Sequence, residues 1–172
     1  MEEWDLYTCE RIKTGRTVVK GSEIPKGYFR LVIHVCVFNK KGELLIQKRQ
    51  ITKSGWPDLW DLSVGGHVIA GETSQQAAER ELKEELGIGF SFQGLRPAVS
   101  PSFPNGFDDM YTILMDLNPE ELILQEEEVQ QEGWADRKRV CEMIDEGVFI
   151  PYHKSLIELL FFLKDHPEAH TA

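Results

Sequence analysis

The chain has 172 residues, of which 41% are hydrophobic and 28% are charged, and this is the composition of a globular protein. Its formal net charge of −10 argues against binding to nucleic acid or to an anionic membrane surface, because both need a basic patch. The three cysteines lack a CxxC spacing, which argues against a disulfide framework and a cysteine-rich zinc site. Without a signal-peptide pattern or an apolar run of about 18 residues, one cytoplasmic domain over residues 1–172 is expected.

The first third of the chain predicts an N-terminal arm followed by three strands. Residues 1–27 have the pattern of a β hairpin or arm, with its turn at residues 13–16. Residues 29–39 are rich in β-branched and apolar residues at both odd and even positions, as in a strand that is covered on both faces. After a turn, residues 43–49 form the returning strand, and residues 59–66 form a short strand that ends at a glycine pair.

The clearest helix signal lies between residues 74 and 86. Thr73 and Gln76 have the spacing of a capping box, and Gly87 suits the left-handed position just after a helix end. Apolar residues also recur at the helical spacing i, i+4 and i+8, which predicts the stripe that packs on the sheet. This stripe consists of Ala78, Leu82 and Leu86.

The rest of the chain predicts more strands and two further helices. Strands are expected at residues 90–99 and 107–117, separated by a loop rich in Pro and Gly. An acidic loop at residues 120–128 leads to a short strand near Trp134. The two helices, which span residues 136–146 and 153–165, end the chain. Strands flanked by helices, without a repeat or long linker, predict an α/β protein of the mixed α+β kind, arranged as an α-β-α sandwich.

Three glutamates share one stripe of the helix predicted at residues 74–86. Glu81, Glu84 and Glu85 stand at i, i+3 and i+4, where like charges disfavour a helix by about 0.2–0.5 kcal/mol per pair. Arg80 can pair with Glu84, but this leaves the other two glutamates uncompensated. A bound divalent cation would convert the repulsion into a set of oxygen ligands suited to Mg²⁺ or Mn²⁺. A solvated acidic face is the alternative interpretation of the glutamate pair taken alone.

Residues 66–88 resemble the Nudix box, G-x5-E-x7-R-E-(aliphatic)-x-E-E-x-G-(aliphatic), at every constrained position. The matching residues are Gly66, Glu72, Arg80, Glu81, Leu82, Glu84, Glu85, Gly87 and Ile88. The resemblance to this MutT-like family implies the Nudix α-β-α sandwich with a mixed central sheet. It also implies a pyrophosphohydrolase that cleaves a nucleoside diphosphate linked to another group, with Mg²⁺ or Mn²⁺ as cofactor.

The resemblance also implies roles for individual residues of the box. Glu81, Glu84 and Glu85 would be metal ligands, with Glu81 a candidate for the base that activates the attacking water. Arg80 would hold a glutamate in place. The predicted catalytic residues are therefore Arg80 and these three glutamates. The carbonyl of Gly66 would complete the metal shell.

Two further roles are implied outside this set. Glu72 would support the corner between the loop and the helix, and Gly87 would end the helix. The family takes a further ligand or base from a later loop, for which Glu127 and Glu128 are the candidates. A solvated acidic loop explains these two residues equally well, and Glu128 is the one we place in the predicted metal site.

Residues 37–68 resemble isopentenyl-diphosphate isomerase and its hydrolase-like relatives, so isomerisation of a carbon–carbon double bond is an alternative reaction. Those isomerases use a cysteine just before the box glycine and a histidine-rich metal site. In this sequence Gly65 stands at the position of the cysteine and Arg30 at that of a histidine, although His67 remains. The complete set of box glutamates favours a hydrolase. A catalytically silent nucleotide-binding module is a third interpretation, which the intact box disfavours.

Predicted substrate contacts rest on residue type and position. Lys48 and Arg49 end a strand and suit a phosphate, although charges on an edge strand are also common. Phe103 and Phe107 suit stacking on a base or packing in the core. Asp108 follows a loop and either reaches the site or caps a turn.

The expected partner is a small-molecule derivative of a nucleoside diphosphate. Because the substrate-binding loops vary in this family, the sequence does not choose among ADP-ribose, dinucleoside polyphosphates, nucleotide sugars, coenzyme A and free nucleoside diphosphates. The N-terminal arm and exposed strands are compatible with a homodimer, the commonest symmetric assembly.

Overall fold

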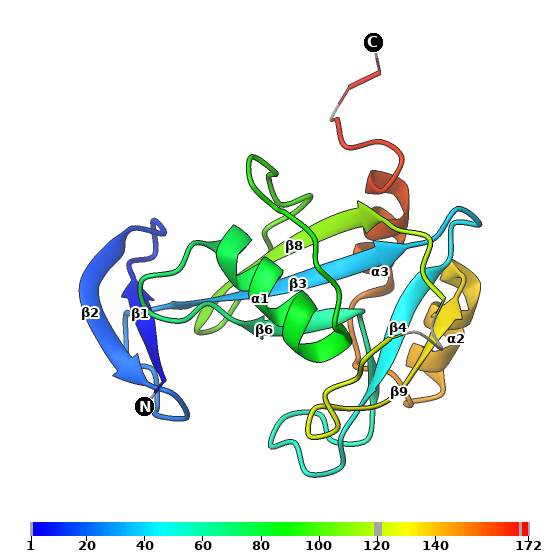
Figure 1. The fold of residues 1–172 in the computed structure, drawn as a ribbon. Coiled ribbons are helices and arrows are strands. Elements are labelled where there is room, and N and C mark those ends of the chain that lie inside the picture. The colour runs from blue at the N-terminus through cyan, green and yellow to red at the C-terminus, as the bar shows by residue number, and fades with distance from the viewer. Residues whose placement is uncertain (1, 119–121, 169, 172) are drawn as a thin grey trace.

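A computed structural model describes residues 2–118, 122–168 and 170–171 (Figure 1). The chain begins with an antiparallel hairpin of β1 (Glu3–Tyr7) and β2 (Lys13–Val19). Its turn lies at residues 8–12, where Arg11 has a φ of 63°, and the turn predicted at residues 13–16 is wrong. The prediction rested on Gly15, which has a positive φ at the point where the pairing register shifts inside the hairpin. A glycine with a positive φ is common in β-bulges as well as in turns, so it did not mark the turn here.

The central sheet is mixed, as predicted. Its middle strand β3 (Arg30–Phe38) pairs in parallel with β8 (Gly106–Leu114) and antiparallel with β4 (Leu44–Arg49) and β6 (Val64–His67). The outer strands are β5 (Trp60–Asp61), β7 (Ser102–Phe103) and β9 (Val129–Ala135). The strand order is β5-β4-β3-β8-β7, with β6 also paired to β3 and β9 to β4.

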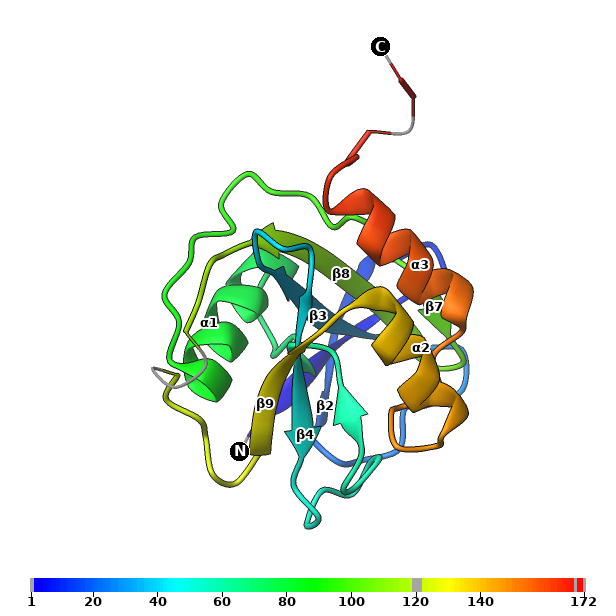
Figure 2. The same cartoon turned by 90° about the vertical axis from the view of Figure 1, so that its right-hand side faces the viewer.

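Helices cover both faces of this sheet (Figure 2). Helix α1 (Ser74–Leu86) lies on one face, and α2 (Arg137–Asp145) and α3 (Lys154–Leu163) lie on the other. Alternate residues of β3 serve the two sides: Ile33, Val35 and Val37 pack with α1, whereas Cys36 and Phe38 pack with α2 and α3. The predicted α-β-α sandwich is therefore confirmed. No helix in the described ranges is both long and apolar enough to cross a membrane.

Helix α1 has the bounds that its sequence signals predict. Thr73 and Gln76 form a reciprocal capping box, and Gly87 is left-handed with a φ of 70°. Of the predicted apolar stripe, Ala78 and Leu82 are completely buried and Leu86 is 1% exposed. Local capping and helical periodicity thus place the glutamates of α1 at a defined edge of the sheet.

The strand predicted at residues 90–99 is wrong. This segment is a loop with one isolated bridge between Val99 and Met110. Its aromatic alternation reflects burial: Phe92 is completely buried and packs edge-on against Tyr111. Conversely, residues 102 and 103 of the predicted loop form β7, and the predicted strand at residues 59–66 is divided into β5 and β6. Residues 119–121, which include the start of the predicted acidic loop, lie outside the described residues.

Candidate active site

A cleft of about 700 Å³ lies between α1, β6 and the N-terminal hairpin. Two loops complete it, at residues 53–55 and around residues 125–128. Predicted site residues from both the box and the surrounding segments line this cleft. They are Arg49, Gly66, Arg80, Glu81, Glu84, Glu85 and Glu128.

Gly66 on β6 lies directly against the Glu81 side chain of α1. A Cβ atom at this position would overlap the carboxyl group of Glu81, so any other residue here would displace the Glu81 side chain. Glycine at position 66 therefore allows Glu81 to lie directly against the strand.

Arg80 connects the loop before α1 to two of the glutamates. Its Nε and Nη2 atoms donate to the Glu72 carboxylate at 2.9 and 3.1 Å, and Nη2 also donates to the His67 carbonyl at 2.9 Å. Its Nη1 lies 2.8 Å from Glu81 Oε1 and 3.1 Å from Glu84 Oε2. Glu72 additionally accepts a bond from the Ile69 amide. Arg80 therefore fixes the corner between loop and helix and reaches the metal-ligand candidates.

The Arg80 contacts correct the expectation that Glu81 has no compensating cation. Helical spacing places only residues at i+3 and i+4 on the same stripe, and so it does not reveal that the long Arg80 side chain also reaches its neighbour. Its hydrogen bonds to Glu72, together with the ion pair with Glu81, raise the pKa of Arg80 further above its usual value. Burial raises the pKa of Glu81, while Arg80 opposes the shift and Glu84 adds to it.

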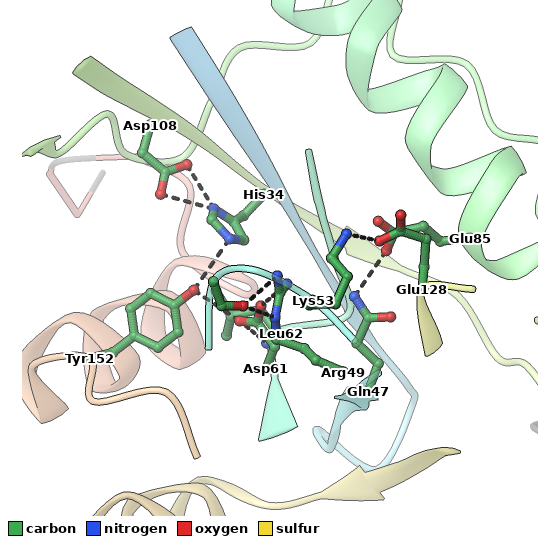
Figure 3. A network of polar contacts seen from close by, with 11 residues as sticks. His34, Gln47, Arg49, Lys53, Asp61, Leu62, Glu85, Asp108, Glu128 and Tyr152 are labelled. Carbon is green, nitrogen blue, oxygen red and sulfur yellow. Dashed lines mark hydrogen bonds and ion pairs between the residues drawn. The ribbon is translucent and has the colours of Figure 1, made fainter. Parts of the chain in front are cut away.

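Glu85 is the most deeply buried of these carboxylates, with 5% of its surface exposed. Burial, followed by repulsion from Glu81, raises its pKa to about 8. Its one hydrogen-bonding side-chain partner in the described chain is Gln47 on β4, whose Nε2 donates to Oε2 at 2.9 Å (Figure 3). The Oε1 atom of Gln47 is itself buried without a hydrogen-bond partner. The negative form of Glu85 is thus under-compensated inside the protein.

The described residues contain no group of three or more His, Cys, Asp or Glu side chains already placed to hold a metal ion. Arg80 holds Glu81 and Glu84, and Lys53 holds Glu128. The donor chemistry nevertheless fits a hard divalent cation, because the four glutamates predicted as ligands offer only carboxylate oxygens. Of the two loop candidates, Glu128 lines the cleft and Glu127 does not.

Cationic side chains face the glutamates across the cleft. Arg49 donates to the Gly55 carbonyl at 3.0 and 3.2 Å and to Asp61 at 3.1 Å, so its guanidinium is held in place. Lys53 forms an ion pair with Glu128 at the mouth of the same cleft. Sequence reasoning missed Lys53, although a lysine in a loop rich in Ser, Gly and Pro just after a predicted phosphate contact was an available signal.

Four other predicted substrate contacts do not line the cleft. Lys48 pairs with Asp58 at 2.7 Å, because it alternates with Gln47 and Arg49 along β4. Phe107 packs against the core under α1, and Phe103 lies beside Arg30. None of these three side chains lines the cleft, so their contact with a ligand stays a prediction.

Asp108, the fourth of these residues, instead belongs to a buried polar cluster on the other side of the sheet. His34 Nδ1 lies 2.9 Å from the Asp108 carboxylate, and His34 Nε2 lies 3.2 Å from the Tyr152 hydroxyl. Tyr152 donates to Asp61 Oδ1 at 2.9 Å, and Asp61 joins the cluster to Arg49 (Figure 3). Burial lowers the pKa of His34, but Asp108 outweighs this effect and raises the pKa to about 9.

Two features distinguish this cleft from an isomerase site. A Cβ atom at Gly65 would lie 2.7 Å from His34 Nε2, so a cysteine does not fit there unless His34 moves. His67 stacks on Trp4 with ring centroids 4.1 Å apart, and burial together with Arg30 and Lys20 lowers its pKa to about 4. A histidine surrounded by cations is a poor place for a metal ion.

Comparisons with known proteins agree with the fold and the box. The NUDIX domain profile matches residues 28–155. The chain is 47% identical over 170 residues to an uncharacterized Nudix hydrolase of Listeria monocytogenes, covering 99% of both proteins. It is 27% identical over 147 residues to the isopentenyl-diphosphate Delta-isomerase of Escherichia coli O127:H6, covering 81% of this chain and 80% of that enzyme.

Among solved structures, the crystal structure of DR0079 from Deinococcus radiodurans is similar with a TM-score of 0.74 and 25% identity. The similarity covers 92% of this chain and 97% of that protein. Together with the domain match and the 47% identical relative, this similarity shows that the chain belongs to the Nudix hydrolase family, as the box predicts.

Proposed function

We propose that this chain is a divalent-cation-dependent pyrophosphohydrolase that cleaves the diphosphate linkage between a nucleoside and another group. The observation that carries the proposal is the arrangement of the cleft: Glu81, Glu84, Glu85 and Glu128 line it together with Arg49 and Lys53. Such a cleft combines oxygen ligands for a cation with positive charges for phosphoryl oxygens. Mg²⁺ or Mn²⁺ fits this donor set.

Cleavage of a diphosphate requires mainly positioning and charge neutralisation, because the reacting phosphoryl oxygens are already anionic. When bound, the divalent ion supplies Lewis acidity and lowers the pKa of the attacking water. Glu81, Glu84 and Glu85 would hold it, with Glu128 as a further ligand. Arg80 restrains Glu81 and Glu84 in the absence of the ion, and Gln47 orients Glu85.

Glu81 is our candidate for the general base. Its raised pKa makes it a better proton acceptor than an ordinary exposed carboxylate, and its place against Gly66 restricts its position. Arg49 is already fixed by Gly55 and Asp61, so it can bind a phosphate without losing much side-chain freedom. Lys53 would exchange Glu128 for a phosphate when the glutamate turns to the cation.

The isomerase alternative is disfavoured by the steric and electrostatic environment of Gly65 and His67. A reactive side chain at position 65 lacks space beside His34, and His67 is held neutral among cations. A silent binding module is also disfavoured, because nothing in binding alone requires four carboxylates around one cleft that must accommodate phosphates.

The direct test is a cleavage assay over a panel of nucleoside diphosphate derivatives with Mg²⁺ or Mn²⁺, with isopentenyl diphosphate isomerisation measured beside it. We expect metal-dependent cleavage, and a loss of at least about 10²-fold in turnover for Glu85→Gln and for Glu84→Gln, the scale observed when one group that stabilises transition-state charge is removed. Glu79→Gln is the matched control on α1, because Glu79 accepts a bond from the Phe92 amide outside the cleft and glutamine retains an accepting oxygen.

Three outcomes would contradict the proposal. Unchanged turnover in both Glu84→Gln and Glu85→Gln would remove the metal-ligand assignment. Isomerisation without cleavage would favour the isomerase, and nucleotide binding without either reaction would favour the binding module.

A further inference from the structure

Arg30 is an unusual cation in the wall of the cleft. It begins β3 and lines the cleft beside the N-terminal hairpin. Its guanidinium lies over two rings, 5.4 Å from the centroid of Trp4 and 5.3 Å from that of Phe103. Within the described part of the chain no carboxylate pairs with it, and its Nε is buried without a hydrogen-bond partner.

The other cations of the cleft all have an anionic partner. Arg80 pairs with the box glutamates, Arg49 with Asp61, Lys53 with Glu128 and Lys20 with Glu2. In a chain with a net charge of −10, carboxylates are abundant, and yet the described residues leave this half-buried guanidinium without one. An unpaired and partly desolvated charge is unfavourable unless a ligand of opposite charge binds to it.

The side chains around Arg30 include His67 and Lys20, which is paired with Glu2. Burial lowers the pKa of Arg30, and the pKa of the neighbouring His67 is lowered by burial and by the charges of Arg30 and Lys20, both of which line the same wall. Trp4 lies between the two groups, stacked on His67 and covered by Arg30. In the wall formed by Trp4, Lys20, Arg30 and His67, here called the arm wall, Glu2 offsets the charge of Lys20, and the charge of Arg30 is left for an anion.

Within the arm wall, Arg30 is separated from the glutamates along the paired strands β3 and β6. Ile33 pairs with Gly66, where Glu81 approaches, and Val32 pairs with His67. Because Arg30 lies two residues before Val32, it is displaced from the Gly66 position by three residues, or roughly 10 Å of strand at about 3.3 Å per residue. A ligand whose scissile diphosphate lies at the glutamates would need another group to meet Arg30.

We propose that Arg30, assisted by Lys20, forms a second anion subsite that binds a phosphoryl group of the substrate outside the scissile diphosphate. The guanidinium fork matches two phosphate oxygens, and aromatic rings against its faces leave its edge to donate. The preferred substrates are then nucleoside diphosphate derivatives with an additional phosphate, either as a monoester on the ribose or as part of a longer phosphate chain. This specificity rests on the proposed hydrolase function, whereas the anion subsite itself does not.

The first experiment measures the subsite without catalysis. Inorganic phosphate is titrated into the metal-free protein while the indole N–H resonance of Trp4 is followed by NMR, because this ring lies against Arg30. We expect saturable shifts, with the dissociation constant at least fivefold higher in Arg30→Gln and in Arg30→Met, which retains an apolar stem between the rings. Arg16→Gln is the matched control: Arg16 also lies over a ring, Tyr28, at 5.7 Å, but does not line the cleft.

The second experiment measures specificity with matched substrates that differ in their number of phosphates. Coenzyme A is compared with its 3′-dephospho form to test the monoester, and diadenosine tetraphosphate with diadenosine diphosphate to test the longer chain. In at least one pair the wild type should have about a tenfold lower KM for the more phosphorylated compound. Arg30→Gln should abolish that difference with little change in kcat, and Arg30→Lys should restore part of it.

The two experiments separate the subsite from the hydrolase. Equal phosphate affinity in wild type and both Arg30 variants, or no saturable shift of Trp4 in the wild type, would overturn the subsite whatever is cleaved. An equal rise in KM for both members of each pair would assign Arg30 a general structural role. Arg30-dependent phosphate binding in a protein that cleaves nothing would retain the subsite and reject the proposed function.

Discussion

Two polar clusters of this protein lie on opposite sides of its sheet and differ in how their charges are balanced. In the His34 cluster, the imidazole meets Asp108 and Tyr152, and Asp61 accepts from Tyr152 and Arg49. In the glutamate cluster of the cleft, Glu85 is buried and accepts a hydrogen bond from one amide. Burial and repulsion from Glu81 both raise its pKa. The first cluster is complete within the chain, whereas the second is not.

The pKa shifts of the two clusters express the same difference. The pKa of His34 rises to about 9 because Asp108 stabilises its charged form, and that of Glu85 rises to about 8 because burial destabilises its charged form. Both residues favour a bound proton, but for opposite reasons. A charge that the fold satisfies contributes to stability, and a charge that the fold leaves unsatisfied indicates a ligand.

Asp108→Asn should have the largest effect on stability. It leaves the His34 imidazolium without its counter-charge, so we expect the free energy of unfolding to fall by about 3 kcal/mol at pH 6. Denaturant unfolding measures this change. The kcat of the folded fraction should change far less than in Glu85→Gln, because Asp108 does not line the cleft. Unchanged stability with a raised KM would instead support the original prediction that Asp108 contacts substrate.

Glu85→Gln should have the opposite effect on the metal-free protein. The folded pKa of about 8 exceeds the ordinary value of 4.5, so the stability that Glu85 provides when protonated is complete below pH 4.5 and is lost as the pH rises through 8. At pH 8 the free energy of unfolding of the variant should therefore exceed that of the wild type by about 1–2 kcal/mol. Denaturant unfolding with a chelator present measures this difference.

The pH dependence of this variant separates the two clusters. With Glu85 removed, the slope between pH 6.5 and 9 should come mainly from His34, whose contribution is complete below pH 6.5 and is lost as the pH rises through 9, whereas the lowered pKa of His67 acts between pH 4 and 6.5. Parallel stability curves for wild type and variant between pH 4.5 and 8 would show that Glu85 is not destabilised by burial.

Local sequence signals predicted α1 well, and they predicted long-range packing poorly. Thr73, Gln76 and Gly87 fix the helix through contacts within a few residues of each end. The failed strand at residues 90–99 shows the limit: alternating aromatic residues indicate burial on one side, but a strand also needs a partner whose edge is free. Here Phe92 fills the space beside Tyr111 without strand pairing.

The candidate site shows the same limit. Arg80 and the three box glutamates of α1 could be predicted because their spacing in sequence is also their spacing on one helix. Gln47 could not be, since it meets Glu85 across 38 positions of the chain. Phe107 and Asp108 are adjacent on β8 and point to its two faces, and only the packed layers reveal that neither residue lines the cleft.

Tyr152→Phe should give the smallest of these effects and tests whether the His34 cluster supports the cleft through Asp61. The variant loses the bond to Asp61 and the contact with His34, but Asp61 Oδ1 still accepts from the Leu62 amide and Oδ2 from Arg49. Because few groups are left unpaired, we expect a loss of about 1 kcal/mol in the free energy of unfolding. Arg49 also keeps its bonds to the Gly55 carbonyl, so KM should stay within about twofold of wild type. A tenfold rise in KM would mean that Tyr152 positions Arg49 through Asp61, and the two clusters would then act as one.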